Sequence, residues 1–442
     1  MPNVYVIGGG TNFYIRPHLA LSAPAFGQTA KDILARLPEE FEESDDEPTK
    51  WMHRLYLTKM AGGRYMSDTN GVFKYYDTNE DVAGLIDEIV ADPEARVVFM
   101  SAALCDFDVP AIVERYPQGH AYEFANIGKD YLRLHTERYI DGTARLELVL
   151  KPSEKIIKRI RQTRKDIFLI GFKTTTWADE DNQFKAGLRL MKQTGCNLVL
   201  ANDLNTRLNM VITPEQAKYA VTKDRAEAIK TLVAMTAARC QGTFTRSTVL
   251  PGDLVPWASS EVPGALRAVV DHAIKRGAYR PFEGKTVGHF AAKVDDGKYL
   301  TSVRKTNFND LLRDPQKNGL VKVETRGNDE VIAYGARPSV GGQSQRIIFA
   351  EHPGLDCIFH AHVQLRPGSK VPRRSQFEHE CGSHQCGANT SSGLTEVEPG
   401  IWAVMLEKHG PNVVFNRNID PNKVIDFIER NFDLEHQTSE QN

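Results

Sequence analysis

Three histidines in the second half of the chain have the spacing of a metal site. His360 and His362 flank one alanine directly after the apolar segment 355–359. Residues two apart on an extended strand project from the same face, so both imidazoles can reach one ion. We expect His409, which follows another apolar segment and precedes a glycine, to supply the third ligand. Three neutral imidazoles with an open fourth position favour Zn²⁺, with Mn²⁺, Co²⁺ or Ni²⁺ as substitutes; the alternative is that these histidines only end strands.

A second cluster of metal-binding residue types follows at Cys381, His384 and Cys386. Its spacing fits no common zinc module. We therefore favour a polar loop over a second metal site in this segment.

Polar residues also end an apolar segment of the first half. Asn202 and Asp203 directly follow a run that has the length of a strand buried in a parallel sheet. Open α/β sheets bind ligands at the carboxyl ends of such strands. The alternative is a core strand whose Asn-Asp pair caps the next helix.

The segment Gly8-Gly9-Gly10-Thr11 follows an apolar strand at 4–7. Glycines let backbone N–H groups approach an anion, and Thr11 adds a hydroxyl group. A structural turn and a phosphate-binding loop both fit this pattern. The segment is not a G-x-G-x-x-G motif, which argues against a nicotinamide cofactor and an oxidoreductase.

The elements that would position these residues alternate between strands and helices in the first half. Expected strands lie at 4–7, 53–58, 96–104, 146–152, 166–172, 197–203 and 209–212. Expected helices lie at 29–37, 81–91, 153–163, 177–195 and 222–239. This order is typical of α/β proteins and predicts a Rossmann-like, mostly parallel sheet in residues 1–240.

The second half has a different pattern of expected helices and strands. Residues 241–262 contain Gly, Thr, Ser and Pro without a clear period and are expected to form a linker. Residues 263–442 are predicted to form an α+β domain. Its expected helices lie at 265–276 and 424–431, and its short strands include 347–349, 355–359 and 402–406.

The composition is that of a soluble globular protein, and the length predicts two domains; we expect the partners to be small-molecule substrates. The chain has 442 residues, 41% of them apolar and 25% charged. A net charge of −2 argues against nucleic-acid and anionic-membrane partners, and no apolar run approaches the roughly 20 residues that span a bilayer. Six scattered cysteines and an amino terminus without signal-peptide features indicate a reduced, cytoplasmic location. We expect a homo-oligomer, either a dimer or a tetramer.

The strand ends of the first half, taken together, resemble the phosphopantothenate–cysteine ligase family over roughly residues 3–238. The matching segments are Gly9-Gly10-Thr11, Ala102-Ala103-Leu104-Cys105-Asp106-Phe107, Leu146-Glu147-Leu148-Val149 with Lys151-Pro152, Leu169-Ile170-Gly171-Phe172, Ala201-Asn202-Asp203, and Asn209 with Thr222-Lys223. This family activates a carboxylate with CTP or ATP, usually with Mg²⁺, and the amine of cysteine then attacks the acyl carbon. The resemblance therefore implies a carboxylate–amine ligase of coenzyme A biosynthesis.

The same resemblance implies the roles of individual residues. Gly8, Gly9, Gly10, Thr11 and Lys223 would bind the phosphates, where a cation offsets the developing charge. The residues that would surround the nucleotide are Cys105, Asp106, Phe107, Gly171, Phe172, Ala201, Asn202 and Asp203. Catalytic roles would fall to Lys223, Asn202 and Lys129, the last standing in for the family's paired lysines. The chain departs from the family pattern at Ala23 and at 173–176.

The second half resembles the class II aldolase/adducin family over about residues 264–432. The matching segments are Pro338-Ser339, Pro353-Gly354 through His360-Ala361-His362, and Leu406-Glu407-Lys408-His409-Gly410. The resemblance implies that the three histidines bind zinc in a metal-dependent aldehyde-lyase.

That family also carries an acid/base glutamate, and Gly341 stands in its place here. Aldol chemistry needs a group that moves a proton beside the metal. Either Glu351 or Glu380 substitutes, or this half binds without cleaving. The second case would make the protein a catalytically reduced scaffold of the adducin type.

Overall fold

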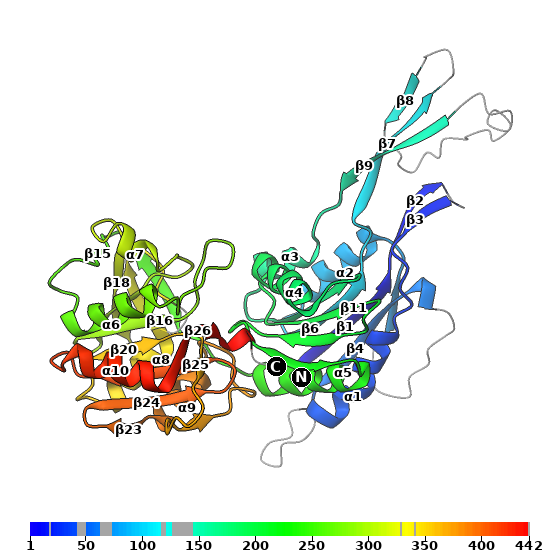
Figure 1. The fold of residues 1–442 in the computed structure, drawn as a ribbon. Coiled ribbons are helices and arrows are strands. Elements are labelled where there is room, and N and C mark those ends of the chain that lie inside the picture. Colours follow the sequence, from blue (N-terminus) through cyan, green and yellow to red (C-terminus); the bar gives the residue numbers. More distant parts are fainter. Residues whose placement is uncertain are drawn as a thin grey trace. The chain divides into compact units, whose positions relative to one another are not determined.

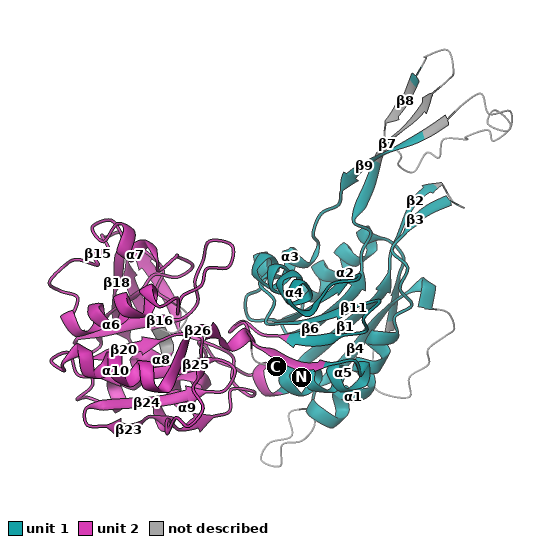
Figure 2. Cartoon of the chain, viewed as in Figure 1, with its two compact units in different colours: residues 1–211, 222–237 teal, residues 212–221, 238–442 magenta. Residues whose placement is uncertain are grey.

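The computed structural model describes residues 1–16, 19–41, 50–61, 73–115, 121–125, 145–327, 329–339 and 342–440. The chain forms two compact units (Figure 2). Unit 1 comprises residues 1–211 and 222–237, and unit 2 comprises residues 212–221 and 238–442. In the described ranges, no helix has the length and apolar character required to cross a membrane.

Unit 1 is built on a sheet with the strand order β12-β11-β10-β6-β1-β4-β5 (Figure 1). The pairs β10–β11, β10–β6, β1–β6, β1–β4 and β4–β5 are all parallel. The strands are β1 (Asn3–Gly10), β4 (Met52–Thr58), β5 (Phe73–Tyr76), β6 (Ala95–Ala103), β10 (Phe168–Thr175), β11 (Leu198–Asp203) and β12 (Asn209–Ile212). The mostly parallel α/β architecture expected from the sequence is confirmed.

Helices follow the strands of this sheet, and their ends are set by local sequence. They are α1 (Gln28–Phe41), α2 (Asn79–Ala91), α3 (Ile157–Thr163), α4 (Glu180–Thr194) and α5 (Arg225–Arg239). Thr78 and Asp81 form a capping box at the start of α2. Asp179 caps the start of α4, and Gly195 ends it with a φ of 73°. α2 and α4 begin after the parallel strands β5 and β10, at the carboxyl ends of these strands.

Short antiparallel strands complete unit 1. β2 (Asn12–Arg16) pairs with β3 (Leu19–Ser22), and β7 (Phe107–Arg115) pairs with both β8 (Ala121–Ala125) and β9 (Arg145–Pro152). A single 3₁₀ turn, η1 (Lys59–Ala61), follows β4.

Unit 2 contains a largely antiparallel sheet with the main order β14-β19-β18-β17-β16-β20-β25-β24-β22. β15 joins it beside β18, and β23 joins it beside β24. Its strands are β14 (Arg246–Leu250), β15 (Val255–Pro256), β16 (His289–Asp295), β17 (Lys298–Ser302), β18 (Gly319–Arg326), β19 (Glu330–Tyr334), β20 (Cys357–His360), β22 (Arg373–Arg374), β23 (Thr395–Glu398), β24 (Ile401–Leu406) and β25 (Gly410–Phe415). Three further strands of the unit are β13 (Lys218–Thr222), which ends just past 221, β21 (Val363–Leu365) and β26 (Phe432–Gln437).

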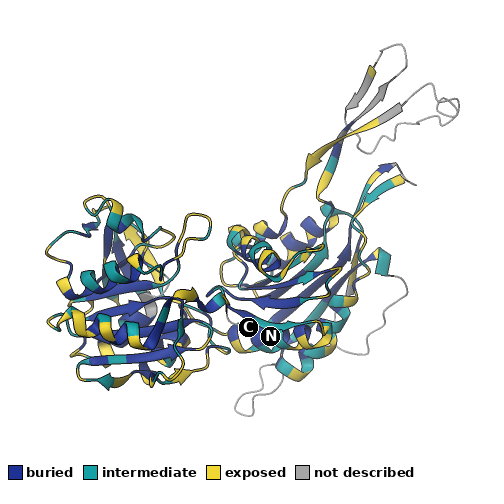
Figure 3. Ribbon diagram, viewed as in Figure 1, coloured by how far each residue is buried: buried dark blue, intermediate teal, exposed yellow. Residues whose placement is uncertain are grey.

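Helices cover both faces of this sheet, and the core strands appear dark blue in Figure 3. α6 (Gly264–Lys275) and α10 (Pro421–Asn431) pack with Phe290 and Ala292 on one face. α8 (Gly342–Glu351) and α9 (His384–Gly393) share the opposite cluster with Ala291. The alternation of residues 290–292 between clusters follows from the two-residue period of a strand. The short helix α7 (Asp310–Arg313) lies between β17 and β18.

The structure differs from the sequence predictions in three places. β1 continues through Gly10, so the expected glycine turn after residue 7 is instead the end of a buried strand. Residues 347–349, expected to be a strand, lie in α8, because a short apolar run fits a buried helix as well as a strand. The segment 241–262, expected to be a linker, carries β14 and β15, which pair with β19 and β18.

Candidate functional site

His360, His362 and His409 meet in unit 2 with a geometry suited to one metal ion. One ligand nitrogen from each lies within 4.8 Å of the other two, and the three side chains are 2–4% exposed. Their ring centroids are separated by 4.8–5.0 Å. His360 ends β20, and His409 lies in the turn between β24 and β25. His362 lies just beyond β20 rather than on it, so the expected shared strand is wrong, although both rings reach the same point.

Two of the three rings are oriented by backbone carbonyl groups. Nδ1 of His360 donates to the carbonyl oxygen of Pro411, and Nδ1 of His362 donates to that of Glu215, both at 2.8 Å. These bonds place the proton on Nδ1, which leaves the lone pair on Nε2. Tyr279 donates to the carbonyl oxygen of His360 at 3.1 Å and fixes the strand end.

Glycine residues let the backbone close around this cluster. Gly410 has a φ of 128°, and a Cβ there would lie 2.1 Å from the carbonyl oxygen of Ala361. Gly288 has a φ of 103°, and a Cβ there would lie 2.7 Å from the carbonyl oxygen of His360. Only glycine fits both the backbone angle and the close approach.

The donor set fits a divalent transition metal. Neither ring nitrogen of His409 has a hydrogen-bond partner among the described residues, although the side chain is buried. Burial lowers the pKa of His360 to about 4, despite the opposing effect of the Pro411 hydrogen bond. Burial also holds the pKa of His409 well below its usual value, with the neighbouring histidines acting in the same direction. Buried, neutral imidazoles are ligands that Zn²⁺ favours.

A fourth buried histidine, His289, lies beside the three and was not found from the sequence. It begins β16 and pairs in register with His360 on β20, with ring centroids 4.7 Å apart. Burial, followed by the charges of His360 and His362, holds the pKa of His289 well below its usual value. A lone histidine at a strand start gives no signal in the sequence, because its partner is set by strand pairing.

A buried ion pair supports the same site. Arg239 donates to Glu215 at 2.9 Å, and both side chains are fully buried. Arg239 also donates to the carbonyl oxygens of Gln376 and Phe377. Because the carbonyl group of Glu215 accepts from His362, this pair holds the segment that orients a metal ligand. Sequence analysis missed both residues, since Glu215 is far from His362 in the chain and Arg239 is far from Gln376.

Glu351 and Glu380, the two candidates for the acid/base role, lie in different environments. Glu351 is exposed at the end of α8 and accepts a hydrogen bond from Ser391. Glu380 is 8% exposed and contributes to the electrostatic environment of Arg239. Gly341 lies outside the described residues. Of the two candidates, Glu380 interacts electrostatically with Arg239, whose partner Glu215 orients His362.

The Cys381, His384 and Cys386 cluster serves the local fold. Nε2 of His384 and the hydroxyl group of Thr245 are 3.2 Å apart, and Cys386 accepts from Gln376. Within the described ranges, the three site histidines are the only set of ligand atoms close enough to hold a metal.

Four cations gather at the same edge of the unit 2 sheet. β17 ends at Ser302, and its register with β16 places this end near the start of β16. Arg304 follows, and its backbone N–H donates to the carbonyl oxygen of Arg337 at 3.0 Å. Burial and then the charge of Arg337 lower the pKa of Arg304; burial and then the charges of Arg304, Lys285 and Arg337 lower that of Lys305. None of the four forms an ion pair with a described acidic residue.

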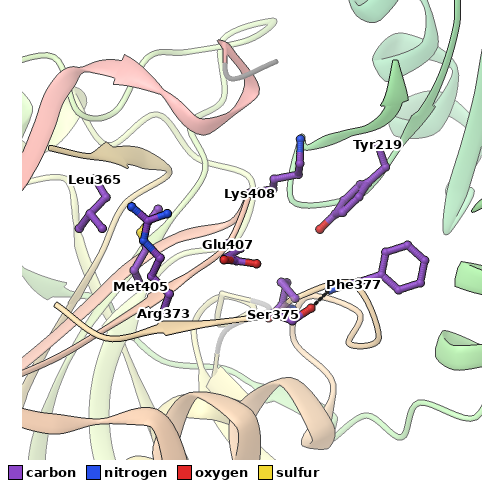
Figure 4. A pocket seen from close by; sticks show the side chains of 9 residues that line it. Tyr219, Leu365, Arg373, Ser375, Phe377, Met405, Glu407 and Lys408 are labelled. Atoms are coloured by element: carbon purple, nitrogen blue, oxygen red, sulfur yellow. Dashed lines mark hydrogen bonds between the residues drawn. The ribbon is translucent and has the colours of Figure 1, made fainter. Parts of the chain in front are cut away.

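Unit 2 also contains a cavity of about 460 Å³ (Figure 4). Its lining residues are Tyr219, Leu365, Arg373, Ser375, Gln376, Phe377, Met405, Glu407 and Lys408. Lys408 extends toward Tyr219, with its ammonium 5.4 Å from the ring centroid. It directly precedes His409 and has a φ of 59°, which is uncommon for a residue with a side chain. The cavity wall and the metal ligand therefore share one turn.

In unit 1, the residues Gly8 to Thr11 are tightly packed. A Cβ at Gly8 would lie 2.2 Å from that of Ala30, and one at Gly10 would lie 1.9 Å from the carbonyl oxygen of Ala23. The N–H of Gly10 donates to Ala25, and that of Thr11 donates to Ala103. Gly9 has a φ of 108°, and its carbonyl oxygen accepts from Tyr76. These contacts give the glycines a structural role, and phosphate binding by residues 8–11 stays a prediction.

The other strand ends of unit 1 differ in accessibility. Gly171 and Ala201 are buried within β10 and β11, whereas Phe172 and Asn202 are partly exposed. Asp203 is buried and accepts from the N–H groups of residues 178, 205 and 206 and from Thr175. Burial raises its pKa, but these hydrogen bonds outweigh that effect and hold the pKa well below its usual value. Asp203 thus closes a turn.

The segment after β6 presents one exposed side. Cys105 is buried; its N–H donates to the hydroxyl group of Thr11, and its carbonyl oxygen accepts from Asn79. Asp106 and Phe107 are exposed, and Asp106 pairs with Lys155 at 2.8 Å. Lys129 lies outside the described residues.

Lys223 is exposed just before α5, and its neighbour Arg225 was missed by the sequence analysis. Arg225 donates to Asn209 at 2.9 Å and to Thr29 in the first turn of α1 at 3.1 Å. Burial lowers the pKa of Arg225. The arrangement brings the starts of α1 and α5 together with two cations, and helix starts attract anions.

Comparisons with known proteins reveal distant similarities to two groups. No family model matches the chain. The coenzyme A biosynthesis bifunctional protein CoaBC of Thermococcus kodakarensis is 25% identical over 201 residues, which are 46% of this chain. The chain spans only 41% of the length of that relative.

Solved structures add two alignments of low similarity. The DNA/pantothenate metabolism flavoprotein from Streptococcus pneumoniae aligns with 51% of this chain and 96% of its own, at 20% identity and a TM-score of 0.40. An L-fuculose 1-phosphate aldolase aligns with 39% of this chain and 84% of its own, at 16% identity and a TM-score of 0.29.

Proposed function

We propose that unit 2 binds one divalent transition metal, Zn²⁺ above all, through His360, His362 and His409, and acts as a class II aldolase-like lyase. The observation that carries this proposal is the convergence of three buried imidazoles whose nitrogens lie within 4.8 Å of one another. Two of them are held by Nδ1 hydrogen bonds, as metal-binding histidines usually are. A metal there would polarise a substrate carbonyl group.

The cations at this sheet edge support an anionic substrate, such as one that carries a phosphate group. Arg304, Lys305 and Arg337 have no acidic partner among the described residues, and their mutual repulsion would be relieved by a bound anion. Guanidinium groups bind phosphate oxygens in a bidentate manner. The chain would therefore hold the substrate at two points, with the reacting oxygens at the histidines.

Elemental analysis of the purified protein tests the metal site. We expect about one zinc per chain in the wild type and near zero in His362→Ala, because a three-ligand site that loses one ligand binds weakly. The matched control is His436→Ala, which removes an exposed histidine of the same unit and should keep the zinc. Equal zinc in wild type and His362→Ala, or none in either, would contradict the site.

For unit 1, we infer nucleotide-dependent ligation of a carboxylate to an amine, with CTP or ATP and Mg²⁺ as cosubstrates. Support comes from the similarity to a protein named for coenzyme A biosynthesis and from the cations at the starts of α1 and α5. Lys223 and Arg225 would bind phosphate groups there. The exposed faces of Asp106, Phe107 and Asn202 would contact the nucleotide.

Thermal shift and pyrophosphate release test this inference. A nucleotide at 100 times its Kd should add roughly 2.7 kcal/mol to the free energy of unfolding. Pyrophosphate release should require both 4′-phosphopantothenate and cysteine, and Lys223→Ala should lower its rate. Lys230→Ala, which removes an exposed cation later on α5, is the control. If release occurs only with another acid, the reaction class stands and the substrate is wrong; no shift with any nucleotide would contradict both.

The alternative is a catalytically reduced scaffold of the adducin type. It is favoured by Gly341 and by Glu351, which is exposed and bonds to Ser391. A protein that binds zinc but neither cleaves sugar phosphates nor releases pyrophosphate would support this alternative.

A further inference from the structure

His289 has the properties of a residue that acts on a ligand rather than on the fold. It is 6% exposed, and its Nε2 has no hydrogen-bond partner among the described residues. Buried polar atoms in proteins are nearly always paired, so an unpaired buried nitrogen indicates a partner that binds there.

Strand pairing directs this side chain to the histidine cluster. In the antiparallel pair β16–β20, His289 is opposite His360, so both side chains lie on the same face of the sheet. The two ring centroids are 4.7 Å apart, with an angle of 40° between the planes. His289 also influences the electrostatics of His409, which belongs to another strand connection. Gly288 holds the strand start against the carbonyl group of His360.

The geometry separates His289 from the three ligands. The nitrogens of His360, His362 and His409 form one close group, and His289 is not a member of it. Among the described ring contacts of the cluster, His289 touches only His360, whereas the three ligands each touch the other two. Its ring therefore lies beside His360, at the side of the three-histidine group.

We propose that His289 is a positioning residue that hydrogen-bonds through Nε2 to oxygen ligands bound beside the three histidines. This proposal rests on the metal site of the proposed function. The ligand class is a small chelator with two adjacent oxygens, such as a hydroxy-carbonyl compound. His289 thereby selects ligands that accept or donate a hydrogen bond at this position, without holding the metal itself.

The test measures chelator binding to the cobalt-loaded full-length protein. Acetohydroxamate offers two adjacent oxygens, and its binding changes the visible absorption of Co²⁺. We compare the wild type with His289→Phe, which removes both nitrogens, and His289→Asn, which keeps a polar group. Cobalt content and the spectrum before chelator addition show whether each variant retains the site.

We expect one cobalt per chain and similar starting spectra in all three proteins. The dissociation constant of acetohydroxamate should rise on the order of tenfold in His289→Phe, the loss of one hydrogen bond, and by much less in His289→Asn. An unchanged constant in His289→Phe overturns the inference. So does the loss of cobalt or an altered starting spectrum in that variant, because His289 would then be a ligand. A wild type that takes up no cobalt instead refutes the metal site of the proposed function, and the role of His289 with it.

Discussion

In unit 2, the sheet edge that carries the histidines has buried polar atoms without partners among the described residues. In unit 1, the buried polar groups at the strand ends chosen from the sequence bond to one another. His289, His409 and Asn412 each have an unpaired buried atom within the described part of the chain. In unit 1, by contrast, Thr11 bonds to Asn79 and Cys105, and Asp203 accepts four hydrogen bonds. Since buried polar groups in proteins are nearly always paired, these atoms make the unit 2 edge suited to a ligand.

The difference shows that similar sequence signals can have opposite meanings. Polar residues at strand ends indicate a binding site only when the fold leaves their polar atoms available. In unit 1, the available side chains are the exposed Lys223 and Asp106 and the partly exposed Asn202, rather than the buried ones.

The largest effect should come from Arg239→Met in unit 2. It leaves Glu215 as a buried carboxylate without its cation, and breaking a buried pair costs about 3–5 kcal/mol. Urea unfolding measures this loss. The control is the double variant Glu215→Gln with Arg239→Met, which removes both charges and should recover much of the stability. A loss below about 1 kcal/mol in the single variant would mean that water reaches the pair.

Acidification of the metal-free protein should affect unit 2 before unit 1. The folded pKa values of His360, His289 and His409 lie below the ordinary value of 6.5, so the unfolded chain binds more protons between about pH 4 and 6.5. Stability is therefore lost as the pH falls through this window, by up to about 1.4 kcal/mol per pH unit for each group. The folded pKa of Asp203 is also lowered. Its carboxylate therefore stabilises the fold above the pKa of an unfolded aspartate, and this stability is lost only as the pH falls below that value.

Scanning calorimetry of chelator-treated protein from pH 7 to 3.5 checks this order. One transition should move down between pH 6.5 and 4 and return to higher temperature with Zn²⁺. Asp203→Asn should leave that movement unchanged and alter only the behaviour below about pH 4. If the transition moves only below pH 4, the buried histidines are not neutral in the folded state.

The sequence predicted the elements of both units because their signals are local. Apolar runs and helical periods identified the strands of the parallel sheet. The two-residue spacing of His360 and His362 indicated a metal site, and His409 was expected to join them because it follows an apolar segment and precedes a glycine. The contributions of His289, Glu215 and Arg239 could not be read in this way. Each depends on which strand or loop lies opposite, and the contacts of His289 with His360 and of Glu215 with His362 are set by the tertiary fold.

The glycine-rich strand shows a different limit. Gly8 to Gly10 have the composition of a phosphate-binding loop, yet they extend β1 because α1 and the segment 23–25 pack against them. Close packing and anion binding both demand the absence of a side chain. Only the neighbours, which the sequence does not reveal, decide between them.

Substitution of these glycines should therefore change stability whether or not a nucleotide is present. Gly8→Ala places a Cβ 2.2 Å from that of Ala30, and overpacking of this kind costs about 1–3 kcal/mol. Gly84→Ala is the control, because nothing lies within 4 Å of that position on α2, and it should stabilise the protein by up to about 1 kcal/mol. A Gly8→Ala protein of normal stability that has lost only its nucleotide-induced shift would restore the phosphate-loop interpretation.

The smallest effect should come from Lys155→Ala at the exposed strand end of unit 1. The Lys155–Asp106 pair is 2.8 Å long, but the side chains are 63% and 69% exposed, and such pairs contribute about 0–1 kcal/mol. Urea unfolding should therefore barely distinguish this variant from Lys165→Ala, which removes an exposed cation of the same unit. A side chain that contributes little to stability is available to bind a ligand. We therefore expect Lys155→Ala to differ from its control in nucleotide affinity rather than in stability. A loss of stability above about 2 kcal/mol would mean that Asp106, like Asp203, has a structural role. The nucleotide site would then be expected around Lys223 and Arg225 instead.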